Sequence, residues 1–212
     1  MHVEQVSGSA ADLHARALPP RATMWHFSVT RPAVVLGSTQ RDDVVDHELA
    51  AARGVDVARR RSGGGAVWLA PGGTLWVDVV LPRDDPRWDD DVSRSALWLG
   101  EAWSQVIRDV TGASAEVHRG AMVCTALSTK ACFAGVGPGE VSIGHRKVAG
   151  ISQRRTRAAA RFQCVAYERW DPAPLAELLH LPADAAAALA DAAVGLGPVL
   201  TEIAGRLPAA LR

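Results

Sequence analysis

The 212-residue sequence lacks the features that mark several common classes of protein. Its three cysteines, Cys124, Cys132 and Cys164, include no C-x-x-C pair, so neither a disulfide framework nor a zinc site is expected. The longest apolar stretch, residues 66–81, is broken by a proline, two glycines and an aspartate and cannot span a bilayer. The first 20 residues have no basic start followed by an apolar run, so no secretory signal is expected. These absences indicate a cytoplasmic protein with reduced thiols.

The chain also has no net charge, because 23 Lys and Arg residues balance 23 Asp and Glu residues. A general nucleic-acid or membrane-surface binder needs an excess of positive charge, so neither partner is expected. The basic residues are nevertheless clustered. Arg59, Arg60 and Arg61 are consecutive, and a second group lies between residues 146 and 161. A local site for an anionic ligand is therefore compatible with the composition.

Hydrophobic periodicity predicts an α+β domain with a mixed, largely antiparallel sheet flanked by helices. Asp91–Val110 has the clearest helical pattern, and Gly112 is its natural stop. A second helix is predicted over Asp42–Arg53, capped by Asp42 or Asp43, and short helices form the Ala-rich C-terminal segment. Strands are predicted from alternating or β-branched runs between turn residues. They cover residues 33–36, 55–60, 66–69, 74–81, 115–118, 122–126, 140–143, 147–152 and 161–167.

The segment Arg59–Val67 (RRRSGGGAV) places three consecutive glycines between two predicted strands. Such glycines weaken a hairpin unless its backbone must approach something closely. Successive backbone N–H groups in this kind of loop bind phosphate or carboxylate, and neighbouring arginines strengthen that binding. The other interpretation is a flexible hairpin tip with solvated arginines. The basic run and the immediate return to a strand favour an anion-binding loop.

Two further residues have side chains suited to catalysis. Lys147 opens an apolar strand, where an ammonium group can hold a carbonyl or phosphate oxygen, and Gly150 would let a ligand lie against that strand. Alternatively, Lys147 is an edge-strand lysine that discourages aggregation. Cys132, next to Phe133, is either a small buried hydrophobe or a thiolate nucleophile, with His118 or His145 as its base.

The combination of these segments resembles one family. Residues 59–67 resemble the RRxSGGGAV loop of lipoate–protein ligases and their biotin-ligase relatives. KVAGIS at 147–152 resembles the family's K-I-x-G-S segment, and AVVLGSTQ at 33–40 resembles its early strand and loop. The resemblance implies a fold shared with biotin ligases and class II aminoacyl-tRNA synthetases. It implies a catalytic domain over residues 1–171, with residues 172–212 as a short helical tail of the same domain.

The resemblance also implies a reaction. Such ligases form an acyl-adenylate from lipoate or octanoate and ATP with Mg²⁺, then pass the acyl group to a lysine of a lipoyl-carrier domain. Lys147 would hold the acyl carbonyl and phosphate oxygens, and Arg59 would stand at the entrance of the binding tunnel. No metal ligand of the chain itself is implied. The substrate or adenylate would contact Ser62, Gly63, Gly64, Gly65, Ala66, Val67, Glu140 and Gly150.

Several departures from the ligase pattern support a second hypothesis. Leu69 stands where ligases commonly have a histidine, and Glu140 replaces an aspartate. The G-N-L-N segment that is common in ligases is replaced by Gly73-Thr74-Leu75-Trp76. The short tail leaves no room for an accessory domain, so a separate accessory protein is one possible partner. Octanoyl- and lipoyl-transferases of the same fold need no ATP and use a cysteine at a position that Cys132 resembles. The full glycine triplet favours the ligase, and a non-catalytic acyl-binding module is the third reading.

Overall fold

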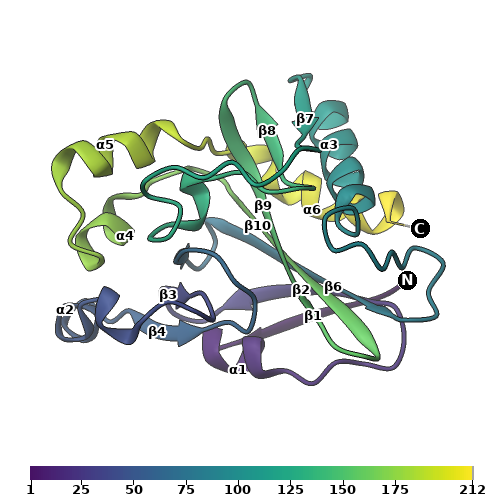
Figure 1. Ribbon diagram of the computed structural model, residues 1–212, viewed down its shortest axis with the longest axis horizontal. Coiled ribbons are helices and arrows are strands. Elements are labelled where there is room, and N and C mark those ends of the chain that lie inside the picture. Colours follow the sequence, from purple (N-terminus) through teal and green to yellow (C-terminus); the bar gives the residue numbers. More distant parts are fainter. Residues whose placement is uncertain (212) are drawn as a thin grey trace.

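Two β-sheets form the centre of the computed structural model, which describes residues 1–211 (Figure 1). In the seven-stranded sheet the order is β1-β2-β6-β10-β9-β8-β7, and in the three-stranded sheet it is β4-β3-β5. Only the β1–β2 and β3–β4 pairs are parallel, which confirms the predicted mixed, largely antiparallel sheet. The strands are β1 His2–Gly8, β2 Thr23–Val29, β3 Ala33–Leu36, β4 Asp56–Arg59, β5 Val67–Leu69, β6 Thr74–Pro82, β7 Ala115–Val117, β8 Val141–Ile143, β9 Arg146–Arg155 and β10 Ala159–Tyr167.

Six α-helices surround the sheets, and α3 packs against α6 at one end of the large sheet (Figure 1). Three short 3₁₀ turns, at Asp42–Val44, Cys132–Ala134 and Gly197–Val199, complete the regular structure of the described chain. None of the helices within residues 1–211 is long and apolar enough to cross a membrane. The helices are α1 Ala10–Ala15, α2 His47–Ala52, α3 Leu97–Thr111, α4 Ala173–Leu178, α5 Ala183–Asp191 and α6 Leu200–Ala210.

The central strands β6 and β10 are buried on both faces, so their alternate residues belong to different cores. Val77 and Val79 face the core that contains α3 and α6, whereas Trp76 and Val80 face the core beneath β2 and α1. The C-terminal segment contributes to this packing. Ile203 of α6 lies in the first core, and α4 packs into a third one beside β3. The side chains of the tail therefore complete cores that the preceding strands begin.

The sequence suggests a short strand and a helical segment within residues 1–20, where β1 and α1 lie, but the second strand of the large sheet was not foreseen. Thr23–Val29 forms β2, although the polar residues Thr23, His26 and Ser28 interrupt its apolar pattern. The predicted strand over 122–126 is wrong. Met122 and Val123 are about half exposed there, and Val123 makes one isolated bridge to Val136. The apolar residues of this segment led to the wrong prediction. A strand also needs a partner along its length, and residues 122–126 have only the single bridge.

Both predicted helices begin later than expected. The segment 42–53 is divided into a 3₁₀ turn and α2, because the Asp46 carboxylate caps α2 by accepting from the Leu49 N–H at 2.8 Å. The helix expected from Asp91 begins at Leu97, after a run of turns, and it ends as predicted at Gly112 in the left-handed conformation. In the C-terminal segment a proline would be expected to end a helix, but Pro208 lies inside α6. Arg212, the last residue of the predicted tail, lies outside the described residues.

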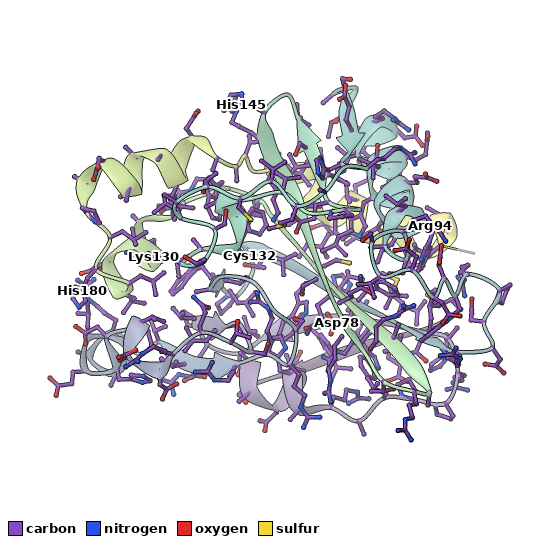
Figure 2. The ribbon with its side chains drawn as sticks, viewed as in Figure 1. Asp78, Arg94, Lys130, Cys132, His145 and His180 are labelled. Carbon is purple, nitrogen blue, oxygen red and sulfur yellow. The ribbon has the colours of Figure 1, made fainter. Side chains whose placement is uncertain are left out.

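A buried ion pair joins α1 to the middle of the large sheet. The Asp78 carboxylate of β6 accepts from Arg161 Nε of β10 at 2.5 Å and from Trp76 Nε1 at 2.6 Å. The other Arg161 nitrogens donate to the backbone oxygens of Leu13 and His14, each at 2.9 Å. Asp78 is labelled in Figure 2, beneath the crossing of β6 and β10. Because every strong donor and acceptor of the pair is satisfied, α1 is held against the sheet by charge-assisted hydrogen bonds.

Replacing Asp78 by alanine is expected to leave Arg161 charged and buried without a carboxylate. Removal of one partner from a buried pair typically costs about 3–5 kcal/mol of unfolding free energy. Urea unfolding followed by tryptophan fluorescence measures this loss. The matched control is Glu202→Ala, which breaks an exposed pair with Arg206 on α6 and should change stability little. Equal losses in the two variants would contradict the role given to the Asp78–Arg161 pair.

Candidate functional site

Two cavities meet at Cys132 and Ser152, which line both of them. Cys132 lies near the centre of the molecule in Figure 2. The first cavity is an open cleft of about 1060 Å³, solvent at its mouth included. The second is narrower, with a volume of about 380 Å³. Residues from both sequence motifs line the open cleft: Gly63, Gly64, Gly65, Glu140 and Lys147.

The glycine loop is joined to the Cys132 segment by backbone hydrogen bonds. Ala66 N–H donates to the Lys130 carbonyl at 2.7 Å, and Cys132 N–H donates to the Ala66 carbonyl at 2.9 Å. A Cβ atom on Gly65 would lie 2.6 Å from the backbone of Ala131, which is closer than two non-bonded heavy atoms can pack. The absence of a side chain at Gly65 therefore allows two segments that are far apart in sequence to meet.

Lys147 lies in β9 at the point where the β8–β9 register shifts, and its side chain is fully buried. Its Nζ is 2.7 Å from Glu140 Oε2 and donates to the carbonyls of Cys132 and Gly135, both at 3.0 Å. The two Glu140 oxygens also accept from the backbone N–H groups of Gly137 and Ile151. The ammonium group thus has three acceptors, one of them a neutralising carboxylate, and it fixes the carbonyl of Cys132.

Cys132 begins the 3₁₀ turn Cys132–Ala134 and is half-buried. Its sulfur lies 4.0 Å from the position that a Cβ on Gly64 would take. The two histidines suggested as its base lie elsewhere: His145 is exposed and contacts Asp191, and His118 contacts the Ala121 carbonyl. Neither histidine lines one of these two cavities. The histidine that does is His14 of α1, which lines the narrower cavity together with Cys132.

The narrower cavity combines apolar walls with one polar group of side chains. Gly150 widens it, since a Cβ there would lie 3.1 Å from the ring of Phe133. The apolar walls suit a hydrocarbon chain, and the few polar groups could fix its orientation. The apolar lining residues are Val35, Val67, Leu69, Trp76, Phe133 and Val165, and the polar ones are His14, Arg60, Ser152 and Gln163.

A chain of hydrogen bonds connects the polar side chains. Gln163 Nε2 lies 2.9 Å from His14 Nδ1, and Gln163 Oε1 accepts from Ser62 Oγ at 2.8 Å. Ser62 Oγ is in turn 3.0 Å from Ser152 Oγ. Burial, together with the guanidinium groups of Arg161 and Arg60, lowers the pKa of His14 to about 3. His14 is therefore neutral at physiological pH, and the Gln163 amide fixes its Nδ1 as an acceptor.

The three consecutive arginines have different surroundings. Arg59 was predicted at the tunnel entrance, but its guanidinium holds the 37–42 segment by donating to the carbonyls of Gly37 and Gln40 and to Asp42 Oδ1. Arg60 is 3% exposed and lines the narrow cavity, whereas Arg61 is exposed. Side chains alternate along an extended chain, so one of three neighbours points inward. The sequence could have revealed this alternation but not which of the two sides faced the cavity.

The sequence matches the family model described as the lipoyl protein ligase A/B catalytic domain over residues 11–195. This match covers most of the chain, so the chain belongs to that family, and the resemblance of its motifs is confirmed. It is an enzyme of the lipoate–protein ligase type by family and fold. No curated protein matches the sequence significantly.

Solved structures share the fold at low sequence identity. A lipoate–protein ligase A bound with ATP has a TM-score of 0.75 and 16% identity, and the alignment covers 99% of this chain and 83% of that one. A T. acidophilum protein of the lipoate protein ligase type with bound lipoic acid has a TM-score of 0.73, 16% identity and the same coverage. The bi-partite lipoate protein ligase of T. acidophilum, studied with its E2 lipoyl domain, has a TM-score of 0.74 and 17% identity, with 99% and 81% coverage.

Gly65→Ala is expected to separate the glycine loop from the Cys132 segment, because the new methyl group would overlap the Ala131 backbone. Overpacking of this kind costs about 1–3 kcal/mol, measured as a lower urea midpoint. Gly63→Ala is the matched control, since a Cβ there meets no atom within 4 Å and the stability should be unchanged. If both variants unfold at the wild-type midpoint, the close approach at Gly65 is not needed.

His14 is expected to make the protein less stable as the pH falls from about 6.5 towards 3. In this window the unfolded chain protonates this histidine and the folded chain does not, so unfolding is favoured by about 1.4 kcal/mol per pH unit for one proton. His14→Asn removes the titrating group and keeps a hydrogen-bond acceptor. Unfolding free energies of both proteins at several pH values test the expectation, and parallel profiles would contradict it.

Proposed function

We propose that this member of the lipoyl protein ligase A/B family transfers a lipoyl or octanoyl group to a lysine of a small carrier domain, with Cys132 carrying the group as a thioester. The observation that carries this proposal is that Cys132 lines both cavities. An acyl chain in the narrow, mainly apolar cavity would present its carbonyl carbon beside the sulfur. The open cleft would then admit the donor and the acceptor lysine in turn. The sequence motifs alone favoured the adenylate route instead.

The charge of the open cleft supports the thioester route over a route through ATP. Among residues 1–211, the charged residues that line the cleft are Lys147 and Glu140, and they neutralise each other. The four-fold negative charge of a triphosphate is normally compensated by several cationic groups and by Mg²⁺ held on carboxylates. The cleft has room for a nucleotide, but both oxygens of Glu140 are already bonded, so the lining fits ATP and Mg²⁺ poorly.

The chemistry requires two balanced acyl transfers. In the first, the sulfur of Cys132 bonds to the acyl carbonyl carbon, the bond to the donor breaks, and the thiol proton leaves with the donor group. In the second, the carrier's lysine amine attacks the thioester, an amide forms, and an amine proton returns to the sulfur. Lys147 acts in both steps by fixing the Cys132 carbonyl and with it the backbone that carries the thiol.

A ligase that forms an acyl-adenylate is the second candidate. The observation in its favour is that Gly63, Gly64 and Gly65 face the open cleft beside the acyl cavity. Their backbone N–H groups and Lys147 would be the groups that hold a phosphate. The similar structure with bound ATP has only its fold in common with this chain at 16% identity. Under this alternative the reaction would use ATP, Mg²⁺ and free lipoate or octanoate.

A lipoyl-carrier domain is the partner that fits either route. The bi-partite T. acidophilum ligase was studied with its E2 lipoyl domain, and it aligns with 99% of this chain. The open cleft gives an acceptor lysine on such a domain a path to the sulfur of Cys132. A separate accessory protein is an additional partner proposed for the ligase alternative, and the T. acidophilum relative is itself described as bi-partite.

Cys132→Ala is expected to abolish ATP-independent transfer from an octanoyl-carrier donor to an apo carrier domain, because the nucleophile is lost. Loss of a covalent nucleophile lowers turnover by roughly 10³-fold or more. Mass spectrometry of the carrier measures the transfer, and acyl-Cys132 should be trapped in the wild-type enzyme. The matched control is Cys124→Ala, which removes an exposed cysteine that lines neither of the two cavities.

The same assay with octanoate or lipoate and labelled ATP distinguishes the alternatives. ATP-dependent acylation that persists in Cys132→Ala would replace the thioester proposal by the ligase. Absence of both activities, with tight binding of the free acid, would instead indicate the acyl-binding module.

A further inference from the structure

Arg60 is a buried cation without a carboxylate partner in the described part of the chain. Three cationic side chains are almost completely buried: Lys147, Arg161 and Arg60. Lys147 is paired with Glu140, and Arg161 is paired with Asp78. Buried charges in proteins are normally paired, because desolvation of a lone ion is costly. The unpaired guanidinium of Arg60 therefore needs an explanation.

Part of the bonding capacity of Arg60 stabilises the glycine loop. Its Nη2 donates to the carbonyls of Gly63 and Gly65 at 2.8 Å, and its Nη1 donates to the Val35 carbonyl at 3.3 Å. These neutral acceptors hold the side chain in place but leave its positive charge uncompensated. The Nε–H group is buried and has no acceptor among residues 1–211. A fixed charge and a free donor therefore remain for a ligand.

This guanidinium lies beside the proposed nucleophile. Arg60 and Cys132 both line the narrow cavity. Arg60 Nη2 lies 2.9 Å, and the Cys132 sulfur 4.0 Å, from the position that a Cβ on Gly64 would occupy. The two side chains thus flank one point of the glycine loop. An acyl carbonyl bonded to that sulfur would lie within reach of the guanidinium.

The other residues of the cavity do not provide a competing anion. Its lining contains no Asp or Glu, and the one histidine in it, His14, is neutral. Lys147 is on the cleft side with all three of its N–H groups used. Arg60 is therefore the cation whose charge is available where the two cavities meet.

We propose that Arg60 is a catalytic residue that donates Nε–H to the carbonyl oxygen of the acyl group on Cys132. This inference rests on the proposed thioester route. When the donor's leaving group or the lysine amine is bonded to the carbonyl carbon, the C=O electron pair moves to oxygen, and the guanidinium stabilises that negative charge. As the intermediate collapses, the C=O bond re-forms and the group that leaves takes the electron pair. Arg60 remains protonated throughout.

This assignment separates the roles of the two cations near Cys132. Lys147, neutralised by Glu140, is the positioning residue that holds the Cys132 backbone. Arg60 supplies the electrostatic stabilisation, because its charge is fixed, desolvated and uncompensated. The low polarity of the surrounding valine, leucine and aromatic side chains strengthens that interaction.

Difference infrared spectroscopy of the octanoyl-enzyme tests the proposal, with ¹³C in the carbonyl carbon. A charged hydrogen bond weakens the C=O bond, so the stretch of the native acyl-enzyme should lie at lower wavenumber than that of the same sample unfolded in urea. Arg60→Met should move the native stretch upward and slow deacylation by a carrier lysine by about 10²–10³-fold. Arg61→Met, which removes the exposed neighbour, should change neither.

The outcomes separate this inference from the proposed function. If wild-type enzyme forms no acyl-Cys132, the thioester route fails and the role of Arg60 fails with it. If acyl-Cys132 forms and its carbonyl stretch is the same in native and unfolded enzyme, the role of Arg60 alone is overturned. If the Arg60→Met variant does not fold, the comparison of the carbonyl stretch in native and unfolded wild-type acyl-enzyme still tests the role of Arg60. A folded Arg60→Met with the wild-type stretch would also overturn the assignment.

Discussion

The short backbone contact between the glycine loop and the segment 130–132 determines the geometry of the site. It brings Ala66 against Ala131 and leaves no space for a side chain at Gly65. Without this contact, Cys132 would not lie where the narrow cavity meets the open cleft. The glycine triplet therefore acts first as a means of bringing two chain segments together. The position of Gly63, Gly64 and Gly65 along the open cleft is a second property of the same loop.

The buried cations differ in whether a carboxylate neutralises them, and this difference separates their structural and proposed catalytic roles. The large sheet contains one buried pair, Asp78–Arg161, that fixes α1, and one, Lys147–Glu140, that fixes the turn containing Cys132. Both pairs are saturated with hydrogen bonds, as buried ions must be. Arg60 differs because its acceptors are neutral carbonyls. The site therefore combines neutralised, structural ions with one uncompensated charge at the point where an acyl carbonyl would lie.

The fold is common to the lipoyl protein ligase A/B family, but fold alone does not decide which reaction a member performs. The thioester route proposed above rests on two local properties. One is the location of a thiol at the junction of two cavities, and the other is the zero formal charge of the cleft lining. Both favour an acyl group held on sulfur. They do so independently of the structures with bound ATP or lipoic acid.

The sequence by itself determined the family, the largely antiparallel sheet and the two motifs around Gly63–Gly65 and Lys147, because these depend on local periodicity and on short residue patterns. It did not determine that β2 exists, that 122–126 is a loop, or that Arg60 and His14 line the narrow cavity. Those features depend on contacts between residues separated by many positions. Burial, pairing and charge compensation are set by such contacts, so only the tertiary structure decided them.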